Sequence, residues 1–216
     1  MRPLRILCFP LICSLLLFSC SSSREISHPS RSVSADQTFS TIENGKFSPL
    51  PSLESPLLFK ASISIFKNYY SGLILIKQMP SNGAIHVVFL SELGLNLMDL
   101  VYKDDEFKVI SVQEFLNKPS ILNTLQNDFR TLLLDLSDID NYSVKKMDDE
   151  VSELLQFKHK SKKYLYCYHE TNGPTHIRRK KGWFGKVDFE IQKNPLRIGI
   201  EHSGIRLKID LTQLKH

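Results

Sequence analysis

The sequence predicts a mainly β fold with some helix (α+β), in which one main helix caps a curved antiparallel sheet that forms an unclosed half-barrel. Three observations predict it. Short segments of alternating apolar and polar residues follow one another from residue 57, their connections are short and rich in turn residues, and one segment has apolar residues at helical spacing. With 216 residues, 42% hydrophobic and 24% charged, the composition is that of a globular protein with one domain, or at most two small ones.

The segment from residue 57 to 112 predicts five strands joined by short turns. Phe59, Ala61 and Ile63 alternate with polar neighbours, which is typical of a half-buried strand. Asn82-Gly83 is a hairpin signal, and the charged run 103–106 predicts another turn. The strands expected here cover residues 59–65, 72–77, 85–89, 95–102 and 107–112.

One helix is predicted over residues 120–135. Pro119 suits the first helical position, and Asp128 and Arg130 lie off the apolar stripe. We expect this stripe to lie on the sheet; its residues are Ile121, Leu125, Phe129, Leu132 and Leu133. The next segment, 136–157, stays open, and its last seven residues suit either a strand or a helix.

The C-terminal third predicts strands again, which brings the total to nine or ten. Asn172-Gly173, Asn194-Pro195 and Ser203-Gly204 mark turns between them. The strands expected here cover residues 164–169, 176–179, 186–192, 196–201 and 205–211.

The first nineteen residues have the pattern of a signal peptide. Arg2 and Arg5 precede an apolar run, residues 6–18, that is too short to span a bilayer. Leu17-Phe18-Ser19-Cys20 resembles the lipobox of bacterial lipoproteins. This resemblance implies that residues 1–19 are removed and that Cys20 carries the lipid that anchors the chain, facing the periplasm. Ordinary cleavage, with Cys20 a bystander thiol, is the alternative.

Residues 20–56 are expected to form the lipidated cysteine and a flexible tether, and residues 57–216 the half-barrel domain. The stretch 21–56 holds eleven serines and four prolines and no sustained apolar periodicity, so it buries too little surface to order itself. A partly ordered arm, mostly over 39–47, is the alternative. Cys167 would be the only free thiol left in the mature chain, so no internal disulfide is expected.

Two strings in the domain carry a resemblance to a known family. Glu92-Leu93-Gly94-Leu95 lies between two predicted strands, and Asn194-Pro195-Leu196-Arg197-Ile198 leads into the last hairpin. Together with the order of elements, over roughly residues 59–214, they resemble the LolA/LolB superfamily of periplasmic lipoprotein carriers and receptors, and most closely its outer-membrane receptors of the LolB type. Two features depart from the receptor pattern: Glu92 stands where the receptors have proline, and residues 138–163 have no counterpart.

The resemblance implies a LolB-like half-barrel and a function. The protein would be anchored in the outer membrane on its periplasmic face, bind acyl chains of lipoproteins or another lipid cargo in an apolar cavity, and help insert the cargo into that membrane. Leu93 would be the membrane-insertion residue, and a periplasmic LolA-like carrier a possible partner; we expect a monomer. The residues expected to line the cavity are Ile63, Ile65, Val87, Phe89, Leu97, Val109, Leu125 and Phe129.

Core and cavity linings have the same composition, so an alternative stays open. In it, the chain is a binding or scaffolding lipoprotein of an envelope complex, with a packed core and no transport. Leu93 has a separate alternative of its own, a buried leucine at the end of a strand. The sequence alone does not separate the two readings.

Two basic runs predict a basic surface that contacts anionic headgroups or an acidic carrier. Its residues are Lys160, Lys162, Lys163, Arg178 and Arg179. Solvated hairpin tips are the alternative. The net charge of +5 falls to +3 once Arg2 and Arg5 are removed, which is too mild to indicate a nucleic-acid partner.

No catalytic residue, metal site or cofactor is predicted. The sequence has no Gly-x-Ser-x-Gly elbow, no His-Glu-x-x-His motif and no glycine-rich phosphate loop. Cys167, His169 and His176 could meet across one hairpin, but a plain aromatic strand explains their neighbours better. We therefore do not expect an enzyme.

Overall fold

The computed structural model describes residues 47–136, 139, 141–147, 152–169, 172–181 and 185–214. They form one helix and twelve strands. The elements are β1 (Leu57–Ile65), β2 (Asn68–Gln78), β3 (Ile85–Ser91), β4 (Asn96–Lys103), β5 (Glu106–Val112), α1 (Pro119–Leu133), β6 (Tyr142–Lys146), β7 (Ser152–His159), β8 (Lys162–His169), β9 (Gly173–Lys181), β10 (Gly185–Gln192), β11 (Arg197–Ser203) and β12 (Leu207–Gln213).

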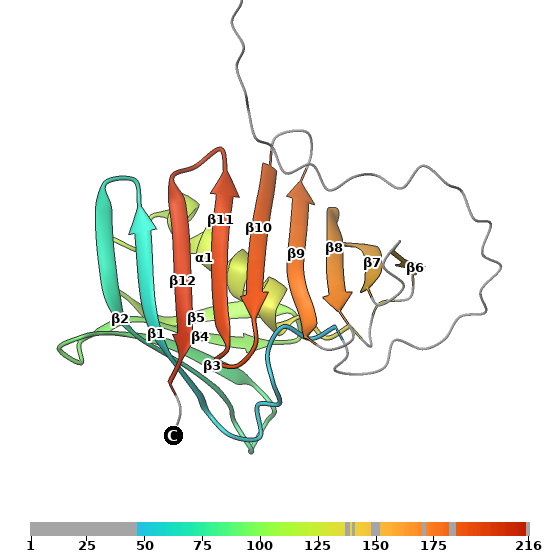
Figure 1. The fold of residues 1–216 in the computed structure, drawn as a ribbon. Helices are drawn as coiled ribbons and strands as arrows, with labels where there is room; N and C mark the ends of the chain where they lie inside the picture. Colours follow the sequence, from blue (N-terminus) through green and yellow to red (C-terminus); the bar gives the residue numbers. More distant parts are fainter. Residues whose placement is uncertain are drawn as a thin grey trace, which may run out of the picture. The chain divides into compact units, whose positions relative to one another are not determined.

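All twelve strands belong to one antiparallel sheet. Their order is β5-β4-β3-β2-β1-β12-β11-β10-β9-β8-β7-β6, so β5 and β6 are the two edges and the described sheet does not close. The sheet bends strongly, with β3 to β5 turned beneath the upright strands and α1 lying on the inner face (Figure 1). The predicted class, a curved antiparallel sheet with one main helix, is confirmed; there are more strands than the nine or ten predicted.

The inner face of the sheet is a continuous apolar layer. Phe89, Ile74 and Phe59 lie opposite one another on β3, β2 and β1, and each side chain is fully buried. Ile63 and Ile209 form a similar buried pair where β1 meets β12. Because side chains alternate between faces along each strand, these rows place the polar residues between them on the outer face.

Helix α1 begins at Pro119, one residue before the predicted start, and ends at Leu133, two residues before the predicted end. Ile121, Leu125 and Phe129 are buried against the inner face. Asp128 is buried as well, so its expected place off the buried stripe is wrong. Its carboxylate has partners within the interior, which is why burial of the charge is tolerated.

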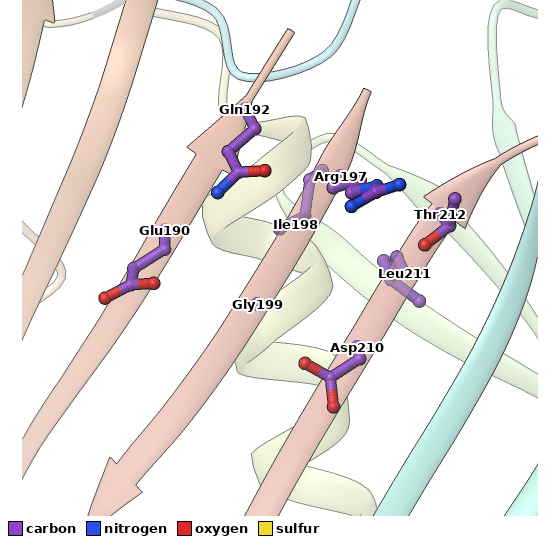
Figure 2. A pocket seen from close by; sticks show the side chains of 8 residues that line it. All are labelled: Glu190, Gln192, Arg197, Ile198, Gly199, Asp210, Leu211 and Thr212. Atoms are coloured by element: carbon purple, nitrogen blue, oxygen red, sulfur yellow. The ribbon is translucent and has the colours of Figure 1, made fainter. Parts of the chain in front are cut away.

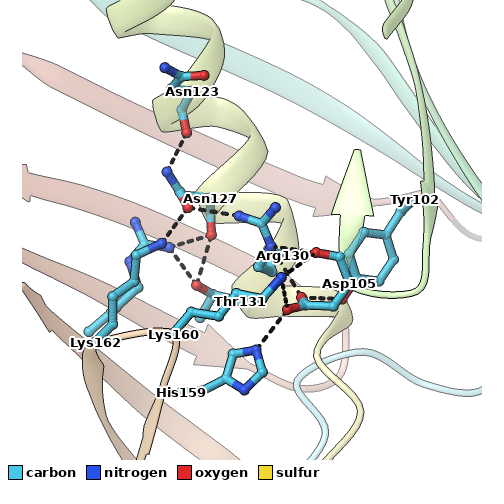
Figure 3. Close-up of polar contacts among 10 residues, drawn as sticks. Tyr102, Asp105, Asn123, Asn127, Arg130, Thr131, His159, Lys160 and Lys162 are labelled. Carbon is cyan, nitrogen blue, oxygen red and sulfur yellow. Dashed lines mark hydrogen bonds and ion pairs between the residues drawn. The ribbon is translucent and has the colours of Figure 1, made fainter. Parts of the chain in front are cut away.

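Polar contacts join the β4–β5 turn to the β7–β8 hairpin, although β4 and β8 are eight positions apart in the sheet. Figure 3 shows the Asp105 carboxylate between Arg130 of α1, His159 and Lys160. The distances are 3.1 Å to Arg130 Nε, 2.8 Å to His159 Nε2 and 2.6 Å to Lys160 Nζ. In a flat sheet eight strand spacings would separate these turns by about 38 Å. The Asp105 cluster is therefore possible only because the sheet curves.

The Asp105 cluster also sets the charge of its carboxyl group. Burial alone would raise the pKa of Asp105, but hydrogen bonds from Lys160, His159 and Tyr102 outweigh it and lower the pKa to about 2. Tyr102 donates its hydroxyl to this carboxylate at 3.0 Å. The turn is therefore fixed by an ionised aspartate at any pH near neutrality.

One predicted border of the domain needs correction, and the segment that the sequence left open forms strands. The tether was expected to run to residue 56, but Phe47 and Leu50 are buried in the core, and the Phe47 ring lies 5.3 Å from that of Tyr168. The open segment 136–157 contains β6 and the start of β7. The predictions for residues 1–46, including the signal peptide and Cys20, lie outside the described residues.

Candidate membrane-contact site

The loop between β3 and β4 presents two leucines to solvent. Leu93 is 89% exposed and Leu95 is 63% exposed. The expectation of an exposed Leu93 therefore holds in the structure, and the alternative of a buried strand-end leucine is excluded. Exposed side chains of this size are free to enter an apolar medium without first unpacking the protein.

Hydrogen bonds within the loop hold it in one conformation. Ser91 N donates to Leu95 O at 2.8 Å, and Leu95 N donates to Ser91 Oγ at 3.0 Å. Gly94 N donates to Ser91 O at 2.9 Å, and Gly94 has a φ of +78°, which glycine adopts at no steric cost. The loop is thus a closed turn that carries Leu93 at its tip.

Glu92, which departs from the receptor pattern, ties this loop to the neighbouring strand. Its carboxylate accepts a hydrogen bond from Ser71 Oγ of β2 at 2.7 Å. Proline would stiffen the loop through its ring, whereas Glu92 does so through this bond. The departure therefore leaves a fixed loop in place.

Sequence reasoning missed three further exposed apolar side chains. Phe66 and Tyr69, at the β1–β2 turn, are 63% and 65% exposed, and Ile205, at the β11–β12 turn, is 42% exposed. Ile205 was predicted to begin a strand, and Phe66 and Tyr69 fall between the strands predicted at 59–65 and 72–77. The signal that marks Phe66 and Ile205 is a large apolar residue inside a short hairpin loop, where polar residues are the rule. Tyr69 lies in β2, opposite Ser64, and carries no such signal.

The predicted cavity lining is packed core in this structure. Ile63, Val87, Phe89 and Leu125 have 0% exposure, Phe129 has 1% and Ile65 has 3%. A side chain that lines a hollow able to hold even one water molecule keeps some accessible surface. The four residues without accessible surface therefore border no hollow, and Phe129 and Ile65 keep too little surface to line a space for an acyl chain. The cavity expected at these six positions is corrected to a filled interior.

The remaining two lining candidates are half-buried and pack against the edge of this core. Leu97 is the extra residue of a bulge: Phe89 pairs with Met98 and Leu90 pairs with Asn96. Met98 and Leu100, both fully buried, take the inward positions that the prediction gave to Leu97. A single inserted residue shifts the alternation of inward and outward side chains, so the sequence alone does not show which residues of β4 point inward.

A hollow of about 240 Å³ lies on the outer face, over β10, β11 and β12 (Figure 2). It opens above Gly199, whose missing side chain leaves room between Glu190 and Asp210. Arg197, Gln192 and Thr212 add polar groups to the rim, and Ile198 and Leu211 complete the lining. Charged and amide groups surround it, so it does not suit an acyl chain.

The predicted basic surface does not form one patch. Arg179 is only 6% exposed and binds Asp128 inside the protein. Lys162 donates to Asn127 of α1, whereas Arg178 faces outward and binds Asp188 at 2.6 Å. Alternation along the strands separates them, because neighbouring basic residues of one run lie on opposite faces. The two members left are Lys163, half-buried on β8, and Lys160, which binds Asp105.

Other kinds of site find little support among the described residues. No group of three or more His, Cys, Asp or Glu side chains there is arranged to hold a metal ion. Cys167 is a free thiol whose pKa is raised by burial, which disfavours a reactive thiolate. Within the part of the chain that the structure covers, no helix is both long and apolar enough to cross a membrane.

No protein-family model and no curated protein sequence matches this chain. The likeness to the LolA/LolB superfamily therefore rests on the order of elements and the local strings described above.

Proposed function

We propose that this protein is an outer-membrane lipoprotein of the LolB type, anchored through Cys20 on the periplasmic face. It accepts the acyl chains of lipoproteins, or of another lipidated cargo, and passes them to the membrane. Transfer breaks no covalent bond and uses no cofactor. It requires only that the affinity for the acyl chain increase from carrier to receptor to bilayer.

The exposed leucine of a fixed hairpin loop is the observation that carries this proposal. Leu93 is the most exposed of the large hydrophobic side chains in the described residues, yet its loop is closed by hydrogen bonds. An apolar side chain held exposed at a fixed site raises the free energy of the protein in water, and its transfer into a bilayer lowers that free energy. This supports a role in which the loop enters the membrane.

The packed interior defines how cargo would have to bind. Of the elements with described positions, α1 is the only helix, and its apolar stripe covers the inner face. Movement of α1 away from the sheet would open the buried part of that face to an acyl chain. Accordingly, we propose that cargo binding displaces α1 and exchanges its contacts for contacts with the acyl chain.

A second candidate function follows from the same packing. If α1 never leaves the sheet, the domain is a scaffolding or binding lipoprotein of an envelope complex. The complete burial of Phe89, Ile63 and Leu125 favours this candidate. The two functions differ in whether the folded domain takes up an acyl chain at all.

A fluorescent fatty-acyl probe separates the two. The assay uses the chain from residue 20 onward with Cys20→Ala, because the lipid expected on Cys20 of the wild type would compete with the probe. Saturable binding of one probe per chain, with the probe protected from an aqueous quencher, is expected for the LolB-type function. Absence of saturable binding would select the scaffolding function.

A further inference from the structure

The tips of two hairpins meet at the end of the sheet from which the Leu93 loop also extends. Phe66 N, in the β1–β2 turn, donates to Arg206 O, in the β11–β12 turn, at 2.7 Å. The two strands that lead into the turns pair in register, with Ile65 opposite Leu207. We use the name tip surface for five of the exposed residues in these turns and at the adjoining start of β2: Phe66, Lys67, Tyr69, Ile205 and Arg206.

The tip surface gathers apolar side chains that the fold does not need. In the described residues, seven large hydrophobic side chains are at least 36% exposed. Phe66, Tyr69 and Ile205 are three of them, and two more lie in the neighbouring β3–β4 loop. Single exposed hydrophobic residues are ordinary, but such a concentration at one end of a sheet indicates a contact surface.

Phe66 also has a backbone conformation that is unfavourable for a bulky residue. Its φ is +56°, in the left-handed region that glycine and asparagine adopt readily and bulky side chains rarely do. With its ring exposed, packing does not repay this strain. A residue that lowers local stability and contributes no core contact points to a role outside the folded domain.

The charges on the tip surface identify what it would bind. Lys67 and Arg206 are exposed, and residues 65–70 and 203–207 include no aspartate or glutamate. The nearby Lys208 is instead paired with Glu201 at 3.1 Å on the outer face. Aromatic side chains beside basic residues that have no acidic neighbours in these turns suit the headgroup layer of an anionic bilayer. Rings and aliphatic side chains enter the interface there, and the basic groups meet the anionic headgroups.

We propose that the tip surface binds the surface of a bilayer that contains anionic lipid. It is a second membrane contact, beside the Leu93 loop, and it goes beyond the proposed delivery of cargo because it needs no cargo. Its effect is to fix the orientation of the domain on the membrane, with β1, β2, β11 and β12 pointing tip-first toward the lipid.

The length of chain before the domain permits this orientation. Phe47 packs on Tyr168, near the β8–β9 turn, which lies at the opposite end of the strands from the tip surface. A nine-residue strand such as β1 spans about 30 Å. The 26 residues from 21 to 46 can reach at most about 90 Å when extended. The anchor and the tip surface can therefore contact the same membrane.

Vesicle co-sedimentation tests the proposal. The chain from residue 20 onward with Cys20→Ala retains every described residue and lacks the lipid, so binding reports the protein surface alone. We expect binding to vesicles of phosphatidylcholine with phosphatidylglycerol, and weaker binding to phosphatidylcholine alone. Phe66→Asn should reduce the affinity about tenfold and leave the thermal midpoint equal or higher, because asparagine relieves the backbone strain.

Matched variants make the result decisive. Ile205→Asn should weaken binding as Phe66→Asn does, and Lys67→Gln with Arg206→Gln should remove the preference for anionic vesicles. Ile110→Asn removes a side chain that is 51% exposed on edge strand β5 and should change nothing. Equal binding by all variants would overturn the proposal. Absence of binding to both kinds of vesicle would also overturn it and would favour an acidic protein as the partner of the tip surface. The assay contains no acyl probe, so its failure is separate from failure of the proposed function.

Discussion

Asp128 of α1 and Arg179 of β9 form an ion pair inside the domain, with 2.7 Å between Oδ1 and Nη2. The two side chains are 1% and 7% exposed. His202 of β11 lies on the other carboxylate oxygen, 2.8 Å from Oδ2. Arg179 also donates to Thr131 and to the backbone oxygen of Asn127. One carboxylate thus fixes α1 over two strands of the inner face.

Replacing Asp128 alone should destabilise the domain strongly. Asp128→Leu leaves the Arg179 charge buried without its carboxylate, and such losses typically cost about 3–5 kcal/mol in unfolding free energy. The double variant Asp128→Leu with Arg179→Met removes both charges and should recover much of this loss. Urea unfolding of the wild type, the single variant and the double variant measures both effects. A double variant as unstable as the single one would show that the pair is not the origin of the loss.

The Asp105 cluster should make stability depend on pH in the acid range. The pKa of Asp105 is about 2 in the folded protein against 3.8 without its partners, so the folded state favours the ionised form. This contribution, about 2 kcal/mol, is present above pH 4 and is lost as the pH falls through 4 toward 2. Asp105→Asn should therefore be less stable than the wild type near neutral pH, and the difference should shrink below pH 4. Urea unfolding at a series of pH values tests this; a difference that stays constant with pH would contradict it.

Much of this fold is predictable because its signals are local. Alternation in segments such as 59–65 and 186–192 marks the strands and their buried side, and Asn82-Gly83 marks a turn in which Gly83 does have a positive φ. The helix follows from Pro119 and from the spacing of Ile121, Leu125 and Phe129. None of these features depends on what the rest of the chain does.

The site was less predictable because its features depend on distant parts of the chain. Arg179 and Arg178 look alike in a basic run. The alternation of β9 turns Arg179 inward, where it is buried under α1, and leaves Arg178 half-buried on the outer face. Leu97 loses its inward position to a bulge. The exposure of Leu93 was expected only from the family resemblance, because the sequence pattern alone fits a loop leucine that is buried as well as one that is exposed.

Gly72 should be the least replaceable glycine of the sheet. A Cβ built on Gly72 would lie 1.9 Å from the backbone oxygen of Leu90 on the neighbouring strand β3. Gly72→Ala therefore forces β2 and β3 apart and should cost several kcal/mol, on the order of the severe core substitutions. Gly199→Ala is the control, because its Cβ would meet only Asp210 Oδ1 at 3.7 Å. Thermal melting of both variants measures the contrast; equal midpoints would show that the two strands move apart easily.

Cys20→Ala should move the protein from the membrane fraction to the soluble fraction. Stable anchoring by acyl chains needs about two of them, and a thioether diacylglycerol on Cys20 would supply both. Cell fractionation with immunodetection measures the distribution. Cys167→Ala is the matched control and should remain with the membrane. A Cys20→Ala protein that still sediments at high ionic strength would contradict the lipid anchor, since high salt screens the weaker attraction of the tip surface to headgroups.

Leu93→Glu should separate cargo binding from cargo release. The side chain is 89% exposed, so the substitution should change the unfolding free energy by no more than about 0.5 kcal/mol. Binding of the acyl probe should stay near normal because the inner face is untouched. Transfer of a triacylated lipopeptide from the protein to vesicles should slow about tenfold or more, since a charged side chain resists entry into the bilayer. Ile110→Glu, at a side chain 51% exposed on β5, should transfer like the wild type. Transfer at the wild-type rate by Leu93→Glu would mean that the loop does not enter the membrane during release, and the LolB-type function would then lose the observation that carries it.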